Sequence, residues 1–163
     1  MKHNNGTFVA VRFHEETVAK LVGFGVANAV PNLIDQAEYH STIAYSRKHL
    51  PNVPKQRDIT PGWIARPIGF DVFSTKSGTN CLVLKIDCPE AIGRHNFLRN
   101  WEGASHDFPT YIPHITLSYD IGDYDVSILK DISVALPEIV IVQEYCQELK
   151  DHDRRKEDRK EEG

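Results

Sequence analysis

The sequence predicts an α+β fold made of two similar halves. Three observations carry this prediction. Several segments alternate apolar and polar residues, as strands with one buried face do. Two segments place apolar residues at helical spacing. The order strand, helix, strands occurs twice along the 163 residues, although the halves share no close sequence repeat. A chain of this length can bury a substantial core.

The first half opens with TFVAVRF, which alternates and is β-branched. Glu15 begins a segment with acidic residues in its first turn and helical apolar spacing, although Gly23 and Gly25 weaken its end. A stretch rich in proline and charge then predicts a loop. The expected elements are a strand at 7–13, a helix at 15–27, a strand at 39–45, a loop at 49–62 and a strand at 63–74.

A turn, TKSGTN, leads into the second half. NCLVLKID reads as a strand, and Pro89 suits the first position of the helix that follows. We place Trp101 on the apolar face of that helix. The expected elements are strands at 80–87, 112–119 and 138–147, and a helix at 89–101. We expect one domain over 1–149. Residues 150–163 contain no apolar side chain and predict a charged, disordered tail.

The composition limits the class of ligand that the protein can bind and the cellular compartment in which we expect it. The net charge is −4, which disfavours a protein that grips long nucleic acid by its phosphates but leaves room for a small anion in a local pocket. Three cysteines without CxxC spacing argue against a disulfide framework or a zinc ribbon and favour a reducing cytoplasm. The sequence shows no apolar run of membrane-spanning length and no secretory signal.

Two short motifs of the same form carry the chemistry. They are His40-Ser-Thr42-Ile and His114-Ile-Thr116-Leu, one in each half. Two such matches arise by chance only at about the one-per-cent level. Two histidines facing each other across a cleft can supply a base and an acid on opposite sides of a phosphorus atom. Each threonine points from the same strand face as its histidine and can donate to a phosphate oxygen.

The runs YHSTIAYSRKHLPN, CLVLKIDCPEAIGRHNFLRN and YIPHITLSYDIGDYD give the chain a family resemblance. It resembles the two-histidine (2H) phosphoesterase superfamily and, more narrowly, the phage anti-CBASS phosphoesterases of that superfamily. The resemblance implies a two-lobed fold whose antiparallel sheets line a central cleft, with helices outside. It also implies a metal-independent, cofactor-free phosphodiesterase. The substrates would be cyclic di- and trinucleotide messengers of CBASS immunity, such as cGAMP, in the host cell cytoplasm.

The same resemblance assigns roles by position. His40 and His114 would be the catalytic pair, with acid and base roles left open, and Thr42 and Thr116 would hold the phosphate. A ribose 2′-hydroxyl would attack its own 3′-phosphate. Family members also sandwich nucleobases between aromatic rings and place a late acidic residue on a base edge. The candidates for these contacts are Phe73, Trp63, Tyr111 and Glu144.

Blander readings remain for several of these residues. Trp63 and Trp101 are typical packing residues, and Glu144 can be the polar face of a strand. Zinc ligation by the motif histidines lacks a third Cys or His at ligand spacing. Two other functions stay open: an RNA-end enzyme that opens 2′,3′-cyclic phosphates, and a non-catalytic protein that sequesters nucleotide messengers. No obligate protein partner is implied.

Overall fold

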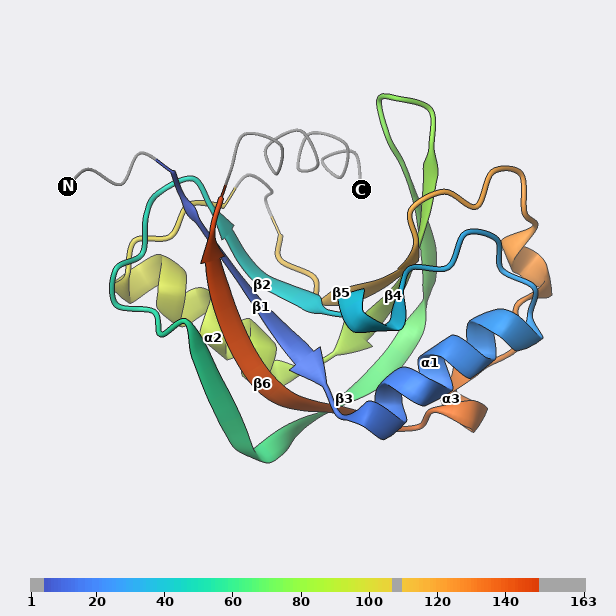
Figure 1. Cartoon of the computed structure of the whole chain (residues 1–163), viewed down its shortest axis with the longest axis horizontal. Helices are drawn as coiled ribbons and strands as arrows, with labels where there is room; N and C mark the ends of the chain where they lie inside the picture. The colour runs from blue at the N-terminus through green and yellow to red at the C-terminus, as the bar shows by residue number, and fades with distance from the viewer. Residues whose placement is uncertain (1–4, 107–109, 150–163) are drawn as a thin grey trace.

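The computed structural model describes residues 5–106 and 110–149 (Figure 1). The predicted tail at 150–163 lies outside the described residues. The strands are β1 (Thr7–Phe13), β2 (Ser41–Ser46), β3 (Gln56–Ser74), β4 (Asn80–Asp87), β5 (His114–Ser118) and β6 (Ile139–Glu148). The helices are α1 (Glu15–Ala27), α2 (Pro89–Trp101) and the short α3 (Ile132–Ala135), with 3₁₀ turns η1 (Gln36–Glu38) and η2 (Val126–Ile128).

The six strands form one antiparallel sheet in the order β2-β1-β6-β3-β4-β5. This order reads the same from either edge when β2 is matched with β5, β1 with β4, and β6 with β3. Each half contains a strand–helix–strand unit, β1-α1-β2 or β4-α2-β5. The inner strands are exchanged: β3 follows β2 in the chain but pairs with β4, and β6 follows β5 but pairs with β1. The α+β prediction and its two-fold pseudo-symmetry agree with this arrangement.

Strand β3 joins the antiparallel strands of the two halves into one six-stranded sheet. Its first part pairs with β6 and its second part with β4. The predicted loop at 49–62 is therefore wrong from Gln56 onward, because that segment is the first part of β3. Pro61 falls at a register irregularity between Asp58 and Trp63, where a missing backbone donor weakens the ladder least.

The core lies between the sheet and the helices. Alternation in β1 turns Val9 and Val11 into this core, and Leu84 and Ile86 do the same from β4. Figure 1 shows a strongly curved sheet with α1 and α2 on its outer side. Gly6 allows β1 to start close against the end of β2, because a Cβ there would overlap the backbone carbonyl of Ser46. Because α1 and α2 pack on the outer side of the sheet, they leave its inner side uncovered.

Curvature brings the two edge strands of the sheet together. Strands β2 and β5 stand at opposite ends of the strand order, yet they contact each other. The first HxT motif begins at His40, one residue before β2, and the second begins at His114, the first residue of β5, so the fold places both motifs at one seam. Within the described ranges, no helix has the length and apolar character needed to cross a membrane.

Candidate active site

The two motif histidines are anchored in the same way. Nδ1 of His40 lies 2.8 Å from the backbone oxygen of Glu38, and Nδ1 of His114 lies 3.0 Å from that of Ile112. Each acceptor is the carbonyl two residues earlier. Because a carbonyl only accepts hydrogen bonds, both Nδ1 atoms must carry the proton. This tautomer assigns proton exchange with a ligand to Nε2 in both rings.

An aromatic ring holds each imidazole from the side. The ring of Phe8 in β1 meets His40 edge to face, with centroids 5.7 Å apart. The ring of Phe73 in β3 meets His114 in the same geometry at 5.5 Å. Such contacts restrict rotation of the imidazole about its own bond. Each histidine is therefore oriented by one backbone bond and one ring contact.

A β-bulge follows the threonine of each motif. The register of β2 against β1 steps from Thr42 to Ala44, so Ile43 is the extra residue. The register of β5 against β4 steps from Thr116 to Ser118, so Leu117 is the extra residue. Bulges bend a strand and re-aim its side chains, and they are frequent beside active sites. Thr42 is half-buried, and Thr116 is only 9% exposed.

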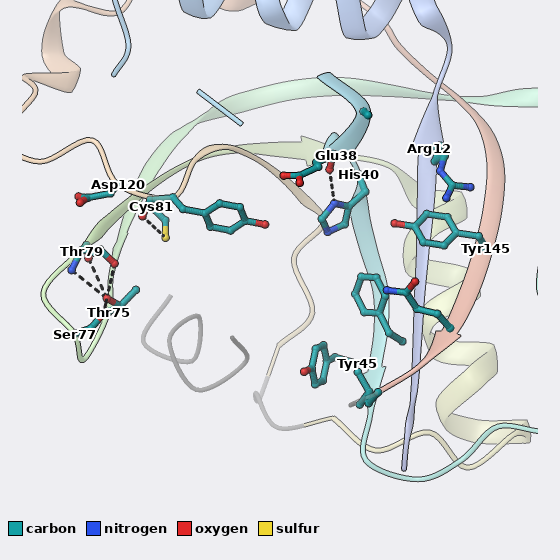
Figure 2. A pocket seen from close by; sticks show the side chains of 15 residues that line it. Arg12, Glu38, His40, Tyr45, Thr75, Ser77, Thr79, Cys81, Asp120 and Tyr145 are labelled. Carbon is teal, nitrogen blue, oxygen red and sulfur yellow. Dashed lines mark hydrogen bonds between the residues drawn. The ribbon is translucent and has the colours of Figure 1, made fainter. Parts of the chain in front are cut away.

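A cavity of about 800 Å³ opens beside His40 (Figure 2). Both halves of the fold contribute to its wall. His40 is the one motif residue that lines this cavity; Thr42, His114 and Thr116 lie outside its lining. The lining residues are Phe8, Arg12, Ala37, Glu38, His40, Tyr45, Thr75, Ser77, Thr79, Cys81, Tyr119, Asp120, Tyr145, Gln147 and Leu149.

One wall of the cavity is aromatic and carries a cation. Phe8 contacts the rings of Tyr45 and Tyr145 edge to face. The guanidinium carbon of Arg12 lies 3.7 Å from the centre of the Tyr145 ring, and its Nη1 donates to Gln143 at 2.9 Å. Burial raises the pKa of Tyr145 and the Arg12 charge opposes that rise. This wall offers flat apolar faces beside a fixed positive charge.

The opposite wall is rich in hydroxyl groups and belongs to the turn between β3 and β4 (Figure 2). Thr75 is the centre of this cluster. Its Oγ1 lies 3.0 Å from the Ser77 hydroxyl and 2.7 Å from the Thr79 hydroxyl, and it accepts from the Thr79 amide at 3.1 Å. Asp120, just beyond β5, also lines the cavity, and its Oδ1 accepts from the Gly122 amide.

The structure distributes the four predicted substrate contacts widely. Phe73 lies against His114, as described above. Trp63 is half-buried and packs against the core. Tyr111 stacks on His95 with ring centroids 4.0 Å apart and a 7° interplanar angle, and its hydroxyl donates to the Thr42 carbonyl at 2.7 Å. The Trp63 and Tyr111 rings are thus committed to packing within the protein.

Glu144 does not line the cavity. It is 0% exposed and opposes Val11, a core residue, across the β1–β6 ladder. Arg94 of α2 donates to both of its carboxylate oxygens, at 2.8 and 3.0 Å, and Arg57 donates at 3.2 Å. A buried carboxylate held by two guanidinium groups ties α2 and β3 to β6. Glu144 is therefore a structural residue here, and the base-edge assignment is not supported.

The placement of Trp101 also differs from the prediction. Its side chain is 77% exposed, so it is not on the packed face of α2. The buried positions of that helix are Ala91, His95 and Leu98, which define a different stripe. Helical spacing alone does not say which of two apolar stripes meets the sheet.

Several of the cavity residues that sequence reasoning missed lie on the second face of β1 and β6. Phe8, Ala10 and Arg12 alternate with the core residues of β1 and so share the opposite face. The alternation in the sequence could have shown that Phe8 and Arg12 share one face of β1, which indicates a binding surface. Their partner Tyr145 could not have been found in this way, because only the ladder places it opposite Ala10. Across residues 5–106 and 110–149, no group of three or more His, Cys, Asp or Glu side chains is arranged to hold a metal ion.

Comparison with known proteins shows the family to which the chain belongs. The model of the family described as anti-CBASS protein Acb1 matches residues 5–156. The chain belongs to the Acb1 family. It is 35% identical to anti-CBASS protein Acb1 of Enterobacteria phage T4 over 147 residues, which cover 90% of each chain. It is 32% identical to the Acb1 protein of Acinetobacter phage Ac42 over 146 residues, or 90% of this chain and 92% of the relative.

Solved structures match at the level of the fold. A crystal structure of a phosphoesterase superposes with a TM-score of 0.51 at 14% identity, covering 90% of this chain and 96% of that one. E. coli LigT complexed with phosphate gives a TM-score of 0.50 at 14% identity, covering 91% and 96%. This member of the Acb1 family therefore shares its fold with these two solved structures, one of which is a phosphoesterase.

Proposed function

We propose that this anti-CBASS phosphoesterase cleaves the 3′–5′ bonds of cyclic di- and trinucleotide messengers such as cGAMP, without a metal ion. Destroying these messengers in the host cytoplasm would block CBASS defence. The observation that carries the proposal is the matched anchoring of His40 and His114. Two imidazoles with the same tautomer, held where two contacting edge strands begin, suit a reaction that needs both a base and an acid.

The chemistry proceeds in two steps. The ribose 2′-hydroxyl attacks the adjacent 3′-phosphorus, and Nε2 of one histidine takes its proton. The P–O5′ bond breaks, and the leaving 5′-oxygen receives a proton from Nε2 of the other histidine. Water then opens the 2′,3′-cyclic phosphate with the two roles reversed. The hydroxyls of Thr42 and Thr116 donate to the non-bridging oxygens, where negative charge grows in the transition state.

The cavity supplies the binding surface for the rest of the substrate. Its volume falls in the ordinary range of small-ligand sites, about 300–1,000 Å³. The wall formed by Phe8, Tyr45 and Tyr145 would stack a nucleobase, and Arg12 would add positive charge near the phosphates. The hydroxyl groups of the β3–β4 turn would meet sugar or phosphate oxygens. Phe73, beside His114, remains the candidate aromatic contact in the second half.

One assay tests the substrate class. The purified protein is incubated with cyclic di- and trinucleotides, with RNA ending in a 2′,3′-cyclic phosphate, and with linear RNA, and products are separated by chromatography. Opened cyclic oligonucleotides are the expected product. Exclusive opening of RNA ends would instead identify an RNA-end enzyme. Tight binding of cyclic nucleotides without any product would identify a sequestering protein.

Metal independence is tested in the same assay. Since two imidazoles already provide acid and base, turnover should be unchanged after treatment with EDTA. Loss of turnover that Mg²⁺ or Mn²⁺ restores would overturn the metal-free mechanism.

A further inference from the structure

The rings of Tyr111 and His95 form a stacked pair next to the first HxT strand. The pair holds two successive carbonyls of that strand. The Tyr111 hydroxyl donates to the oxygen of Thr42 at 2.7 Å, and Nδ1 of His95 donates to the oxygen of Ile43 at 2.7 Å. The stack itself is close, with centroids 4.0 Å apart. Both donors therefore act as one unit on the backbone of β2.

Strand β2 needs these donors because of where it lies. It is an edge strand, so only one of its sides is paired with a neighbouring strand. Ile43 is also the extra residue of the β-bulge, so it is not paired with any residue of β1. A buried carbonyl in such a place requires a donor from outside the ladder. His95, from α2, provides it for Ile43, and Tyr111 provides it for Thr42.

Tyr111 connects this support to the second motif. It precedes His114 by three residues, and the intervening Pro113 accepts a hydrogen bond from the Ile86 amide at 3.0 Å. The segment that leads into β5 is thereby fixed to β4. At its other end, the Tyr111 hydroxyl reaches the residue that carries the first phosphate-binding hydroxyl. One side chain thus links Thr42 of one half to the strand of His114 in the other.

We propose that Tyr111 and His95 are positioning residues that set the spacing and orientation of the two HxT motifs across the seam between β2 and β5. This inference rests on the proposed function for its kinetic part. In-line displacement needs the base and the acid on opposite sides of phosphorus, and a shift of about 1 Å in a reacting group can lower a rate about 100-fold. Loosening the link should slow the chemical step and leave substrate affinity intact.

Burial keeps both donors in the required protonation state near neutral pH. It raises the pKa of Tyr111 far above its ordinary value, so the hydroxyl retains its proton. It lowers the pKa of His95, whose side chain is almost fully enclosed. Nδ1 of His95 keeps its proton in the neutral ring because the Ile43 carbonyl can only accept.

The test compares Tyr111→Phe with a matched control, Tyr124→Phe. The Tyr124 hydroxyl also donates to a backbone carbonyl, that of Asn28, but it lies away from the motifs. Each variant loses one oxygen atom and one such bond. We expect Tyr111→Phe to lower kcat about 10- to 100-fold with KM changed less than about threefold. Tyr124→Phe should keep the wild-type kcat, even if its thermal midpoint falls by as much as that of Tyr111→Phe.

His95 is tested by a donor-deleting and a donor-keeping variant. His95→Leu should lower kcat as Tyr111→Phe does, and His95→Asn, whose Nδ2 can replace Nδ1, should restore much of it. If His95→Leu does not fold, Tyr111→Phe decides alone. Wild-type kcat in Tyr111→Phe, an equal kcat loss in Tyr124→Phe, or a rise in KM alone would overturn the positioning role.

A readout without turnover separates this inference from the proposed function. Proton–carbon NMR spectra of the imidazole rings report on their surroundings whatever the substrate. Tyr111→Phe should shift the signals of both His40 and His114, whereas Tyr124→Phe should shift neither. A wild-type protein that cleaves no cyclic oligonucleotide would overturn the proposed function alone. Unmoved histidine signals in Tyr111→Phe would overturn the positioning role alone.

Discussion

His40 and His114 donate Nδ1–H to equivalent acceptors, each the backbone carbonyl two residues earlier, at 2.8 and 3.0 Å. The match extends to the edge-on phenylalanine beside each ring and to the bulge after each threonine. Two halves with little sequence in common have thus arrived at one local arrangement. The arrangement defines which atoms of the motifs a substitution should remove and which it should keep.

Asparagine variants of the two histidines separate anchoring from proton transfer. In His40→Asn and His114→Asn the amide nitrogen can take the place of Nδ1, but no group replaces Nε2. Each variant should fold with a thermal midpoint near that of the wild type and lose at least about 10²-fold in turnover, the usual scale for removing a general acid or base. Turnover close to wild type in either variant would remove that histidine from the mechanism.

Valine variants of the two threonines test the phosphate contacts. Thr42→Val and Thr116→Val keep the shape of the side chain and delete the hydroxyl donor. Loss of one transition-state hydrogen bond should raise the barrier by roughly 2–4 kcal/mol, as in an oxyanion hole. Single-turnover rates measure this effect directly. An unchanged single-turnover rate with weaker substrate binding would show that the hydroxyls bind the ground state only.

A substrate without the attacking hydroxyl tests the identity of the nucleophile. A cyclic dinucleotide with 2′-deoxyribose beside the scissile phosphate should bind with similar affinity and resist cleavage. The reason is that an internal nucleophile owes its advantage to being held next to phosphorus. Binding is measured by calorimetry and cleavage by chromatography. Rapid cleavage of the deoxy compound would mean that water attacks phosphorus directly.

Local patterns predicted much of the fold at residue level. The elements at Thr7–Phe13, Glu15–Ala27, Asn80–Asp87 and Pro89–Trp101 begin and end where the sequence places them. Period-two alternation, a first-turn acid and a proline at a helix start are local signals. The first part of β3 was missed because its strand character comes from pairing with β6, where Arg57 opposes Glu144. No property of the segment around Arg57 contains that partner.

The candidate site was predictable to a similar depth. The duplicated motif points to His40 and His114 as the candidate pair, because the proposed chemistry needs both a base and an acid; their catalytic role stays a prediction. The cavity wall was not identified, since it depends on which side of a ladder a residue occupies. Glu144 and Tyr145 are neighbours in sequence, yet one is enclosed beneath α2 with Arg94 and the other lines the cavity. A shift of one residue along a strand exchanges the two faces.

The aromatic wall should bind a nucleobase through its ring faces. Tyr145→Leu should raise the substrate Kd about 5- to 150-fold, the range that about 1–3 kcal/mol of base stacking gives. Tyr145→Phe keeps the ring and should bind nearly as the wild type does. Trp101→Ala is the matched control, because Trp101 is an exposed aromatic residue outside the cavity. Equal weakening by Trp101→Ala and Tyr145→Leu would contradict a specific stacking site.

Acid should destabilise the protein through His95. Burial lowers the pKa of this ring; the hydrogen bond to Ile43 opposes the shift, and the charges of His106 and Arg99 add to it. An unfolded histidine titrates near about 6.5. As pH falls through that value, His95 binds a proton in the unfolded chain but stays neutral in the native protein. The free energy of unfolding therefore decreases until the pH reaches the native pKa. Urea midpoints at pH 7.5 and 5.5 should differ less for His95→Asn than for the wild type.

The exchange of β3 and β6 between the halves governs when the protein can become active during synthesis. Strand β1 is made first, yet its neighbour β6 pairs Thr7 with Glu148, near the far end of the described chain. Until the ribosome has delivered that strand, β1 and β3 lack the strand that joins them. Contacts so distant in sequence slow folding. Nascent chains that end before β6 should therefore be inactive, and each new molecule should begin to act only after translation of β6 is complete.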